Sequence, residues 1–320
     1  MSTSTMTSAW PFGRDPACQW GASHLGGDVK TSFGEMEQVD SGICSLSDED
    51  MARMRNLSLH CGEVERCEYG EMSLPEDTDE DGDNLLHLAI IHEARHVAHE
   101  LLRRDLQRRL LNATNHLMQT PLHLAIVTNQ EELAAALATV GADIEAQDLA
   151  GNSPLHLACT LGAHGCLRVV TSAQNPRVLT RALCTPNYEG LTCLHTAVLR
   201  RDKEMVEYLL RIGANANDED PRSGRTVLHA AVEMQDEGIC ETLVWHKANP
   251  NAAAWDGCTP LHVAAGLGHG KLAALLSRLG ANQKARNLEG ETPLDLARHN
   301  PSVLTMLQFD DIRIDGELLH

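Results

Sequence analysis

Aromatic side chains are scarce in this sequence: they make up 3% of the 320 residues, whereas leucine, alanine and other small side chains are abundant. Aromatic residues normally supply much of the buried area of a globular core. A chain with so few of them is expected to pack short aliphatic helices against one another, as solenoid proteins do. No run of residues approaches the roughly 18 apolar positions of a membrane span, so the sequence predicts no membrane as partner.

The chain also lacks the cysteine spacing of a disulfide framework or a zinc site. None of its ten cysteines forms a CxxC pair, and reduced thiols are the expectation for a chain of this length. The first residues, Met1 to Met6, have neither the basic region nor the apolar core of a secretory signal. The sequence therefore predicts a soluble intracellular protein.

Positive charge is in short supply, most of all near the N-terminus. Residues 1–81 carry 17 acidic and 5 basic side chains, and the whole chain has a formal net charge of −19. A nucleic-acid binder needs a basic surface that displaces counterions, so this composition argues against nucleic acid as partner. It favours a basic partner instead.

What the sequence does contain is an internal repeat. The string Pro121-Leu122-His123-Leu124-Ala125 returns with few changes, and the histidines of its copies are 36, 33, 39, 34 and 33 residues apart. The copies are centred on His87, His123, His156, His195, His229 and His262, and a seventh has Asp295 instead. The pattern resembles the ankyrin repeat, whose T-P-L-H-x-A signature has a period of about 33. The resemblance implies an all-α solenoid of six full ankyrin repeats and a partial seventh over residues 81–307.

The residues of each copy have physical reasons to form two helices and a turn. Thr120 and its counterparts precede the first helix as N-caps, and Pro121 and its counterparts follow at the first helical position, where no N–H is needed. Gly141, Gly213 and Gly280 stand where a left-handed residue ends the second helix. About six extra residues near Ser172 to Arg177 are expected to lengthen a surface loop or a helix end.

Two histidine patterns invite a metal interpretation, and neither is favoured. The signature histidines fall in separate repeats, so we expect each one to be buried, neutral and bonded to backbone groups of adjacent loops. The string His92-Glu93-Ala94-Arg95-His96 matches the zincin motif H-E-x-x-H, which requires one continuous helix. The repeat alignment places a turn at Glu93 and Ala94, which separates the two histidines. We therefore predict no metal, no cofactor and no catalytic residue.

Residues 1–80 show no repeat and are acidic from Glu35 onward, a composition typical of disorder. They contain Asp40-Ser41-Gly42-Ile43-Cys44-Ser45, which resembles the phosphodegron of the IκB family, the inhibitors of NF-κB transcription factors. The resemblance implies that the IκB kinase phosphorylates Ser41 and Ser45, and that an F-box ubiquitin ligase reads Asp40, Gly42 and the two phosphates. Lys30 lies eleven residues before Ser41 and matches the family's ubiquitin acceptors.

Further residues match the family around the first repeat. Asp81, Asp83 and Glu93 stand where family members contact the basic nuclear localisation segment of a Rel protein, and a carboxylate at a rigid edge can pair with such a segment. Met51, Met54, Leu57 and Leu59 have the spacing of a leucine-rich nuclear export signal, although such patterns are frequent by chance. The tail at 308–320, with its Phe309-Asp310-Asp311 string, is most similar to the epsilon member of the family.

The sequence thus predicts a disordered regulatory arm over 1–80, an ankyrin domain over 81–307 and a short tail over 308–320. The resemblance implies an inhibitor that binds Rel dimers, masks their nuclear localisation segment and keeps them in the cytoplasm. Phosphorylation of the inhibitor then leads to its ubiquitination and degradation. The export pattern implies that the inhibitor also passes through the nucleus. Two alternatives stay open: a nuclear IκB-like cofactor of DNA-bound Rel dimers, and an ankyrin scaffold for another partner.

Overall fold

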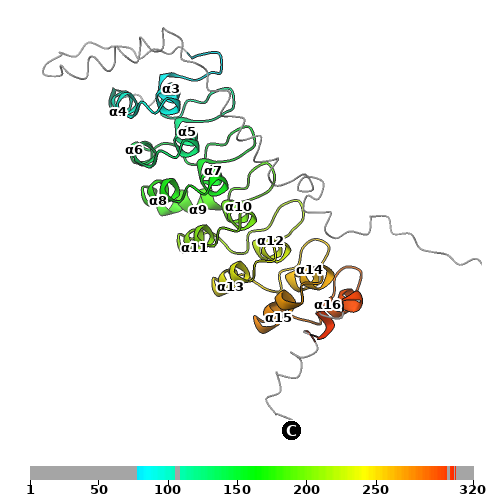
Figure 1. Ribbon diagram of the computed structural model, residues 1–320. Helices are drawn as coiled ribbons and strands as arrows, with labels where there is room; N and C mark the ends of the chain where they lie inside the picture. Colours follow the sequence, from blue (N-terminus) through cyan, green and yellow to red (C-terminus); the bar gives the residue numbers. More distant parts are fainter. Residues whose placement is uncertain (1–77, 105–108, 301–302, 306, 308–320) are drawn as a thin grey trace, which may run out of the picture.

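The computed structural model describes residues 78–104, 109–300, 303–305 and 307 (Figure 1). The predicted degron from Asp40 to Ser45, the predicted acceptor Lys30 and the predicted export pattern from Met51 to Leu59 lie outside the described residues, as does the tail from 308. None of the helices in the described ranges is long and apolar enough to cross a membrane.

The described part of the chain consists of short antiparallel helix pairs that stack one after another in a single direction. The first helices form one row, the second helices form a parallel row, and the connecting turns project on the side of the first helices (Figure 1). The pairs are α3 (Leu85–Ile91) with α4 (Arg95–Arg104), α5 (Pro121–Val127) with α6 (Glu131–Val140), α7 (Pro154–Leu161) with α8 (His164–Ser172), α10 (Cys193–Leu199) with α11 (Lys203–Arg211), α12 (Val227–Glu233) with α13 (Glu237–Trp245), and α14 (Pro260–Gly266) with α15 (Gly270–Arg278). The short α16 (Pro293–Leu296) and the 3₁₀ turn Ala297–His299 come last. This is the ankyrin fold predicted from the sequence.

The helix ends lie where the capping residues predict them. Thr120 precedes α5 in an extended conformation and Pro121 is its first residue, and Thr259 and Pro260 repeat this at α14. Gly141 follows α6 with a left-handed φ of 98°, which lets the chain leave the helix without the clash that a Cβ atom would cause.

A single elongated core runs between the two helix rows. It consists almost entirely of leucine, alanine, valine, isoleucine and cysteine side chains, among them Leu86, Leu122, Leu155 and Leu194, each with no exposed surface. Alanines such as Ala125 and Ala158 stand where successive helices approach one another, because a small side chain permits close stacking. Burial of one leucine contributes about 1.5–3 kcal/mol, so the core explains how a chain with few aromatics holds a stable fold.

The extra residues after α8 fold differently from the prediction. They form an additional helix, α9 (Pro176–Cys184), which contacts α10 (Figure 1), not a longer loop or helix end. Asn175 caps it by accepting from the backbone N–H of Arg177, and Leu179, Ala182 and Leu183 are buried. The spacing of these apolar residues, three and four apart, is the helical signal that the prediction overlooked.

The H-E-x-x-H string is interrupted as predicted. His92 caps the end of α3, Glu93 has a left-handed φ of 53°, and His96 is the second residue of α4. The two histidines therefore belong to different helices, which is incompatible with the geometry of a zincin site.

Candidate partner-binding surface

The turns that precede the first helices, here called fingers, are held rigidly at their bases by the signature histidines. In four repeats the imidazole Nδ1 accepts from the backbone N–H of the N-cap residue, and Nε2 therefore carries the proton and donates to a carbonyl of the next finger. His123 joins Thr120 N–H to the carbonyl of Asn152, and His156 joins Ser153 N–H to the carbonyl of Leu191. In the same way His229 joins Thr226 to Cys258, and His262 joins Thr259 to Glu291. All eight distances lie between 3.0 and 3.2 Å. The bridging role predicted for the histidines is thus confirmed at these four positions.

At His156 the lowering effect of burial is outweighed by the neighbouring Cys193 and the Leu191 carbonyl, which raise the pKa. At the other three bridging positions burial favours the neutral imidazole. It lowers the pKa of His229 to about 4 and also lowers the pKa values of His123 and His262. A protonated ring could not accept the N-cap N–H at Nδ1, so the neutral state is the one that the hydrogen bonds require.

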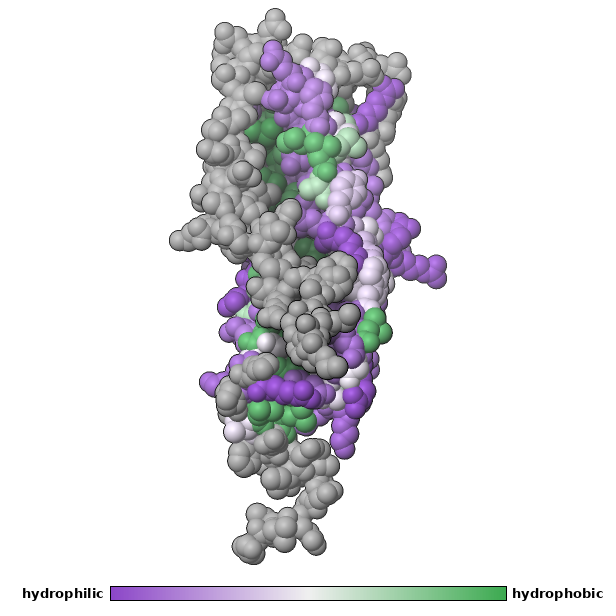
Figure 2. All heavy atoms as spheres, turned by 90° about the vertical axis from the view of Figure 1, so that its right-hand side faces the viewer, coloured by the Kyte–Doolittle hydropathy of each residue, from purple (hydrophilic) through white to green (hydrophobic). Residues whose placement is uncertain are grey.

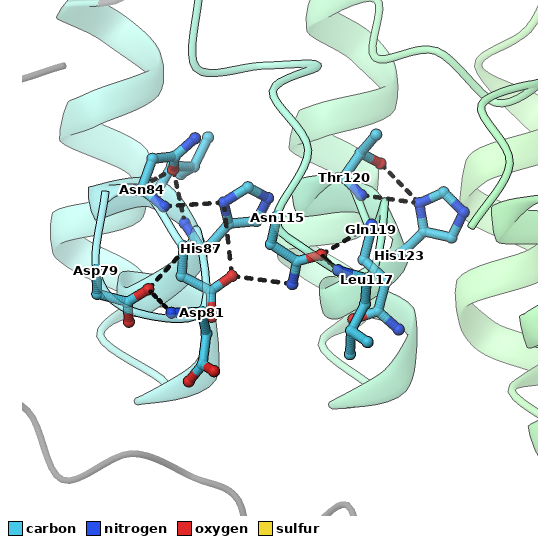
Figure 3. Close-up of polar contacts among 11 residues, drawn as sticks. Asp79, Asp81, Asn84, His87, Asn115, Leu117, Gln119, Thr120 and His123 are labelled. Carbon is cyan, nitrogen blue, oxygen red and sulfur yellow. Dashed lines mark hydrogen bonds and ion pairs between the residues drawn. The ribbon is translucent and has the colours of Figure 1, made fainter. Parts of the chain in front are cut away.

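Each described finger except the one at 254–259, which begins with Ala254, is closed by the aspartate or asparagine that begins it. In the finger at 79–84, Asp79 Oδ1 accepts from the backbone N–H groups of Asp81 and Asp83, at 3.0 and 2.8 Å. Asn115 Oδ1 makes the same pair of bonds to Leu117 and Gln119, at 3.0 and 2.9 Å, in the finger at 115–120 (Figure 3). A side-chain oxygen that replaces a backbone acceptor in this way is the reason for these residue types at turns.

Neighbouring fingers are joined to one another by a backbone ladder. The second residue of a finger donates its N–H to the carbonyl of the residue that precedes the left-handed position of the preceding finger. These bonds are His116 to Asp81, Leu149 to Leu117, Tyr188 to Ala150, Trp255 to Ser223 and Leu288 to Asp256, at 2.9–3.1 Å. Pro221 has no N–H to donate, so the ladder fixes the finger tips between residues 79 and 192 relative to one another, and separately those between residues 220 and 292.

The three predicted contact residues occupy different places. Asp81 is exposed at the tip of the finger at 79–84, whereas Glu93 is exposed in the turn between α3 and α4, at the opposite end of α3. Asp83 is only 7% exposed; its Oδ1 accepts from the Asn115 side-chain amide at 3.0 Å and lies 3.8 Å from Nδ1 of His87 (Figure 3). The structure thus corrects the expectation for Asp83: the carboxylate that was expected to meet a partner is engaged inside the protein, between two fingers.

Apolar side chains at the finger tips are the feature that the sequence analysis missed. The larger ones that stand exposed on the fingers are Leu117, Met118, Leu149, Tyr188, Trp255 and Leu288. Figure 2 looks onto this side of the molecule and shows hydrophobic residues interspersed with hydrophilic ones along it. The signal in the sequence is that Leu149, Tyr188 and Leu288 each directly follow the aspartate or asparagine that begins a finger. It identifies exposed residues only once the turns are placed.

This surface suits a partner protein better than a small substrate. Rigid neighbouring tips present apolar area flanked by carboxylates, which is the composition of an interaction surface. Among the residues that the structure describes, no group of three or more His, Cys, Asp or Glu side chains could hold a metal ion.

Comparisons with known proteins agree with this fold. A family model of three ankyrin repeats matches residues 59–148, 147–220 and 169–254, and a model of a single ankyrin repeat matches residues 256–288. Among solved structures, the ankyrin repeat domain of Bcl-3, described as a unique member of the IkappaB protein family, is 38% identical with a TM-score of 0.68, and the match covers 72% of this chain and 100% of that one.

Curated relatives point the same way. NF-kappa-B inhibitor epsilon of Homo sapiens is 40% identical over 244 residues, which is 75% of this chain and 48% of the relative. NF-kappa-B inhibitor alpha of Sus scrofa is 41% identical over 192 residues, which is 58% of this chain and 60% of the relative. The chain thus spans less than two thirds of the length of these curated relatives.

Proposed function

The chain belongs to the IκB family of ankyrin-repeat proteins, and we propose that it inhibits NF-κB by binding Rel dimers along its finger edge. The single observation that carries this proposal is the rigid finger edge itself, on which exposed carboxylates at Glu80 and Asp81 adjoin apolar tips at Leu117 and Leu149. A partner that matches it has a basic segment next to an apolar face. The names of the relatives supply the identity of that partner, since they are inhibitors of NF-kappa-B.

In this proposal the acidic end of the solenoid receives the basic nuclear localisation segment of a Rel protein. Asp81 contributes from the finger tip, and Glu93 contributes from the turn between α3 and α4. Exposed charge pairs add little affinity one at a time, but complementary charge raises the association rate and fixes the register of the segment. Masking that segment would retain the Rel dimer in the cytoplasm.

Release would follow from the arm that precedes the repeats. Phosphorylation of Ser41 and Ser45 by the IκB kinase would add about −3 to −4 charge and create the signal that an F-box ubiquitin ligase recognises through Asp40 and Gly42. Ubiquitin transfer to Lys30 would then commit the inhibitor to degradation. The export pattern at Met51, Met54, Leu57 and Leu59 would return complexes that enter the nucleus.

A second candidate is a nuclear IκB-like cofactor of DNA-bound Rel dimers, with which a match to Bcl-3, described as a unique member of the IkappaB protein family, is compatible. The degron-like string favours the inhibitor, because signal-dependent degradation would release a Rel dimer that the inhibitor had retained. One experiment separates the candidates. The full chain is mixed with a purified Rel dimer, with and without its DNA site, and the complexes are weighed by native mass spectrometry.

A 1:1 complex of the chain with the dimer that excludes DNA supports the inhibitor. A ternary complex with DNA supports the nuclear cofactor. No complex with any Rel dimer contradicts both candidates and leaves a scaffold for another partner.

A further inference from the structure

One finger breaks a backbone rule that the others follow. The residue before the last two of each finger has a left-handed conformation, and in the other described fingers it is glycine, with φ between 69° and 81°. These glycines are Gly82, Gly151, Gly190, Gly224, Gly257 and Gly290. In the finger at 115–120 the position is held by Met118, whose φ is 59°. A methionine in this conformation brings its Cβ atom against the adjacent carbonyl oxygen, so it destabilises the fold relative to glycine.

The fold itself gives no compensating reason for the methionine. Met118 is 46% exposed and takes no part in the hydrophobic core. Its backbone N–H donates to Asn115 O at 2.9 Å, a bond that the glycines at 151, 190, 257 and 290 make equally in their own fingers. Any residue except proline would keep that bond, so what distinguishes methionine is its exposed side chain.

That side chain lies within a row of exposed apolar tips. Its neighbour Leu117 is 49% exposed, Leu149 in the next finger is 59% exposed, and Tyr188 in the finger after that is 69% exposed. The ladder bonds from Leu149 to Leu117 and from Tyr188 to Ala150, both 3.1 Å, hold these tips side by side. We call Leu117, Met118, Leu149 and Tyr188 the apolar strip.

The apolar strip is continuous with the acidic finger. His116, directly before the strip, donates its N–H to the carbonyl of Asp81 at 2.9 Å, and Glu80 and Asp81 are exposed. An occupant of this edge would therefore place a basic segment at 80–81 and an apolar face at 117–188. This pattern disfavours an acidic or purely polar partner.

We propose that the apolar strip is the specificity-determining contact for the Rel dimer, and that Met118 is kept at a strained position because its side chain enters that contact. The inference rests on the proposed function for the identity of the partner. Methionine suits the role, since its flexible thioether adapts to an irregular apolar surface. Stability at this finger is thus reduced in favour of binding, as is common at functional positions.

The decisive variant is Met118→Gly in the full chain, because it removes the strain and the side chain together. Its thermal midpoint should rise by about 2 °C, while its affinity for a Rel dimer, measured by isothermal titration calorimetry, should fall by roughly fivefold or more. The matched control is Lys247→Gly: Lys247 also has a left-handed φ, 69°, but it lies at the end of α13 and away from the finger tips. This control should gain stability without any change in affinity.

A third variant, Met118→Leu, keeps an apolar side chain at the strained position and should bind within about twofold of wild type. Unchanged affinity of Met118→Gly, beside a wild type that binds normally, would overturn the contact while leaving the proposed function intact. A lowered midpoint for Met118→Gly would show that the methionine stabilises the fold and would overturn the trade-off. If the wild type binds no Rel dimer, the proposed function fails first.

Discussion

The side-chain amide of Asn115 donates to the carboxylate of Asp83 across 3.0 Å, and this bond joins the first two described fingers (Figure 3). The same bond recurs two fingers later, where the amide of Asn187 donates to Asn152 Oδ1 at 2.9 Å. Asp83 and Asn152 hold equivalent positions, so an aspartate and an asparagine serve as the same acceptor. The difference between them is charge, and the charge is buried at Asp83.

Asp83→Asn should therefore stabilise the domain at neutral pH. Burial raises the pKa of Asp83 to about 6 from an ordinary 3.8, which means that the folded state disfavours the ionised carboxylate. Stability from this group is fully present below pH 3.8 and is lost as the pH rises through about 6. We expect a gain of about 1–3 kcal/mol for the asparagine at pH 7, with a smaller difference at pH 4.

Chemical denaturation of the wild type and of Asp83→Asn at several pH values tests the predicted gain in stability. Asp81→Asn, a change at an exposed residue of the same finger, serves as control and should leave stability within about 0.5 kcal/mol at every pH. A destabilised Asp83→Asn protein at pH 7 would mean that the carboxylate is required in its charged form.

The bridging histidines predict acid sensitivity. The folded-state pKa of His229 is about 4, below the ordinary 6.5, because the ring is buried. Its contribution is therefore fully present above pH 6.5 and is lost as the pH falls through 4. His229→Ala should lower the free energy of unfolding by about 2–4 kcal/mol at pH 7, since it leaves the Thr226 N–H and the Cys258 carbonyl without their partner. The variant should also lose less stability than the wild type as the pH falls from 6.5 to 4.

His96→Ala is a suitable comparison, because His96 is exposed on α4. It should change stability by no more than about 0.5 kcal/mol. Denaturation curves for His229→Ala that match those of His96→Ala would refute the structural role of the bridge.

The sequence was sufficient to predict the ankyrin fold, the cap residues and the bridging histidines, because each of these depends on short-range patterns that recur with a fixed period. It was insufficient for α9, where a single insertion has no second copy for comparison. It was also insufficient for Asp83, since whether a carboxylate faces solvent or a neighbouring asparagine depends on how two fingers stack. The apolar tips were missed for a related reason: a leucine after an aspartate is identified as exposed only when the turn is placed.

Charge reversal at the finger tip tests the proposed contact with a basic segment. Asp81→Lys should weaken binding to a peptide with a Rel localisation segment by roughly three- to tenfold at low salt, because it removes an attraction and adds a repulsion. The effect should shrink as ionic strength rises. Asp81→Lys alone is the appropriate variant, because a lysine at the buried Asp83 would disturb the fold. Fluorescence anisotropy at two salt concentrations measures it, and identical isotherms at low salt would remove Asp81 from the interface.

Replacement of Ser41 and Ser45 together by alanine should abolish stimulus-induced loss of the protein. The change should leave the stability and Rel binding of the repeat domain unaltered, because neither serine belongs to the repeats. Quantitative immunoblots after stimulation, with thermal melts as the folding control, give the answer. Normal clearance of the double variant would mean that these residues are not the degron.

Lys30→Arg tests the predicted ubiquitin acceptor, and the scarcity of lysine makes the result easy to interpret. The chain has five lysines, and the other four, Lys203, Lys247, Lys271 and Lys284, lie in the repeats more than 150 residues beyond Lys30. If residues 30–41 are disordered, as their composition predicts, eleven residues have an r.m.s. span of about 20 Å, and an amine at Lys30 would then reach the surroundings of a ligase bound at Ser41. The lysines of the repeats are presented to that ligase only if the whole domain moves.

Arginine keeps the charge of Lys30 and removes the nucleophilic amine, so phosphorylation and Rel binding should survive while ubiquitin conjugation falls sharply. Ubiquitination reconstituted on the doubly phosphorylated protein, followed by mapping of the modified sites, measures this. Lys203→Arg is the matched control, since it makes the same chemical change on the repeat domain, and it should be conjugated at the wild-type rate. If Lys30→Arg is conjugated as fast as this control, the amine that accepts ubiquitin lies elsewhere, and the arm is not a self-contained degradation signal.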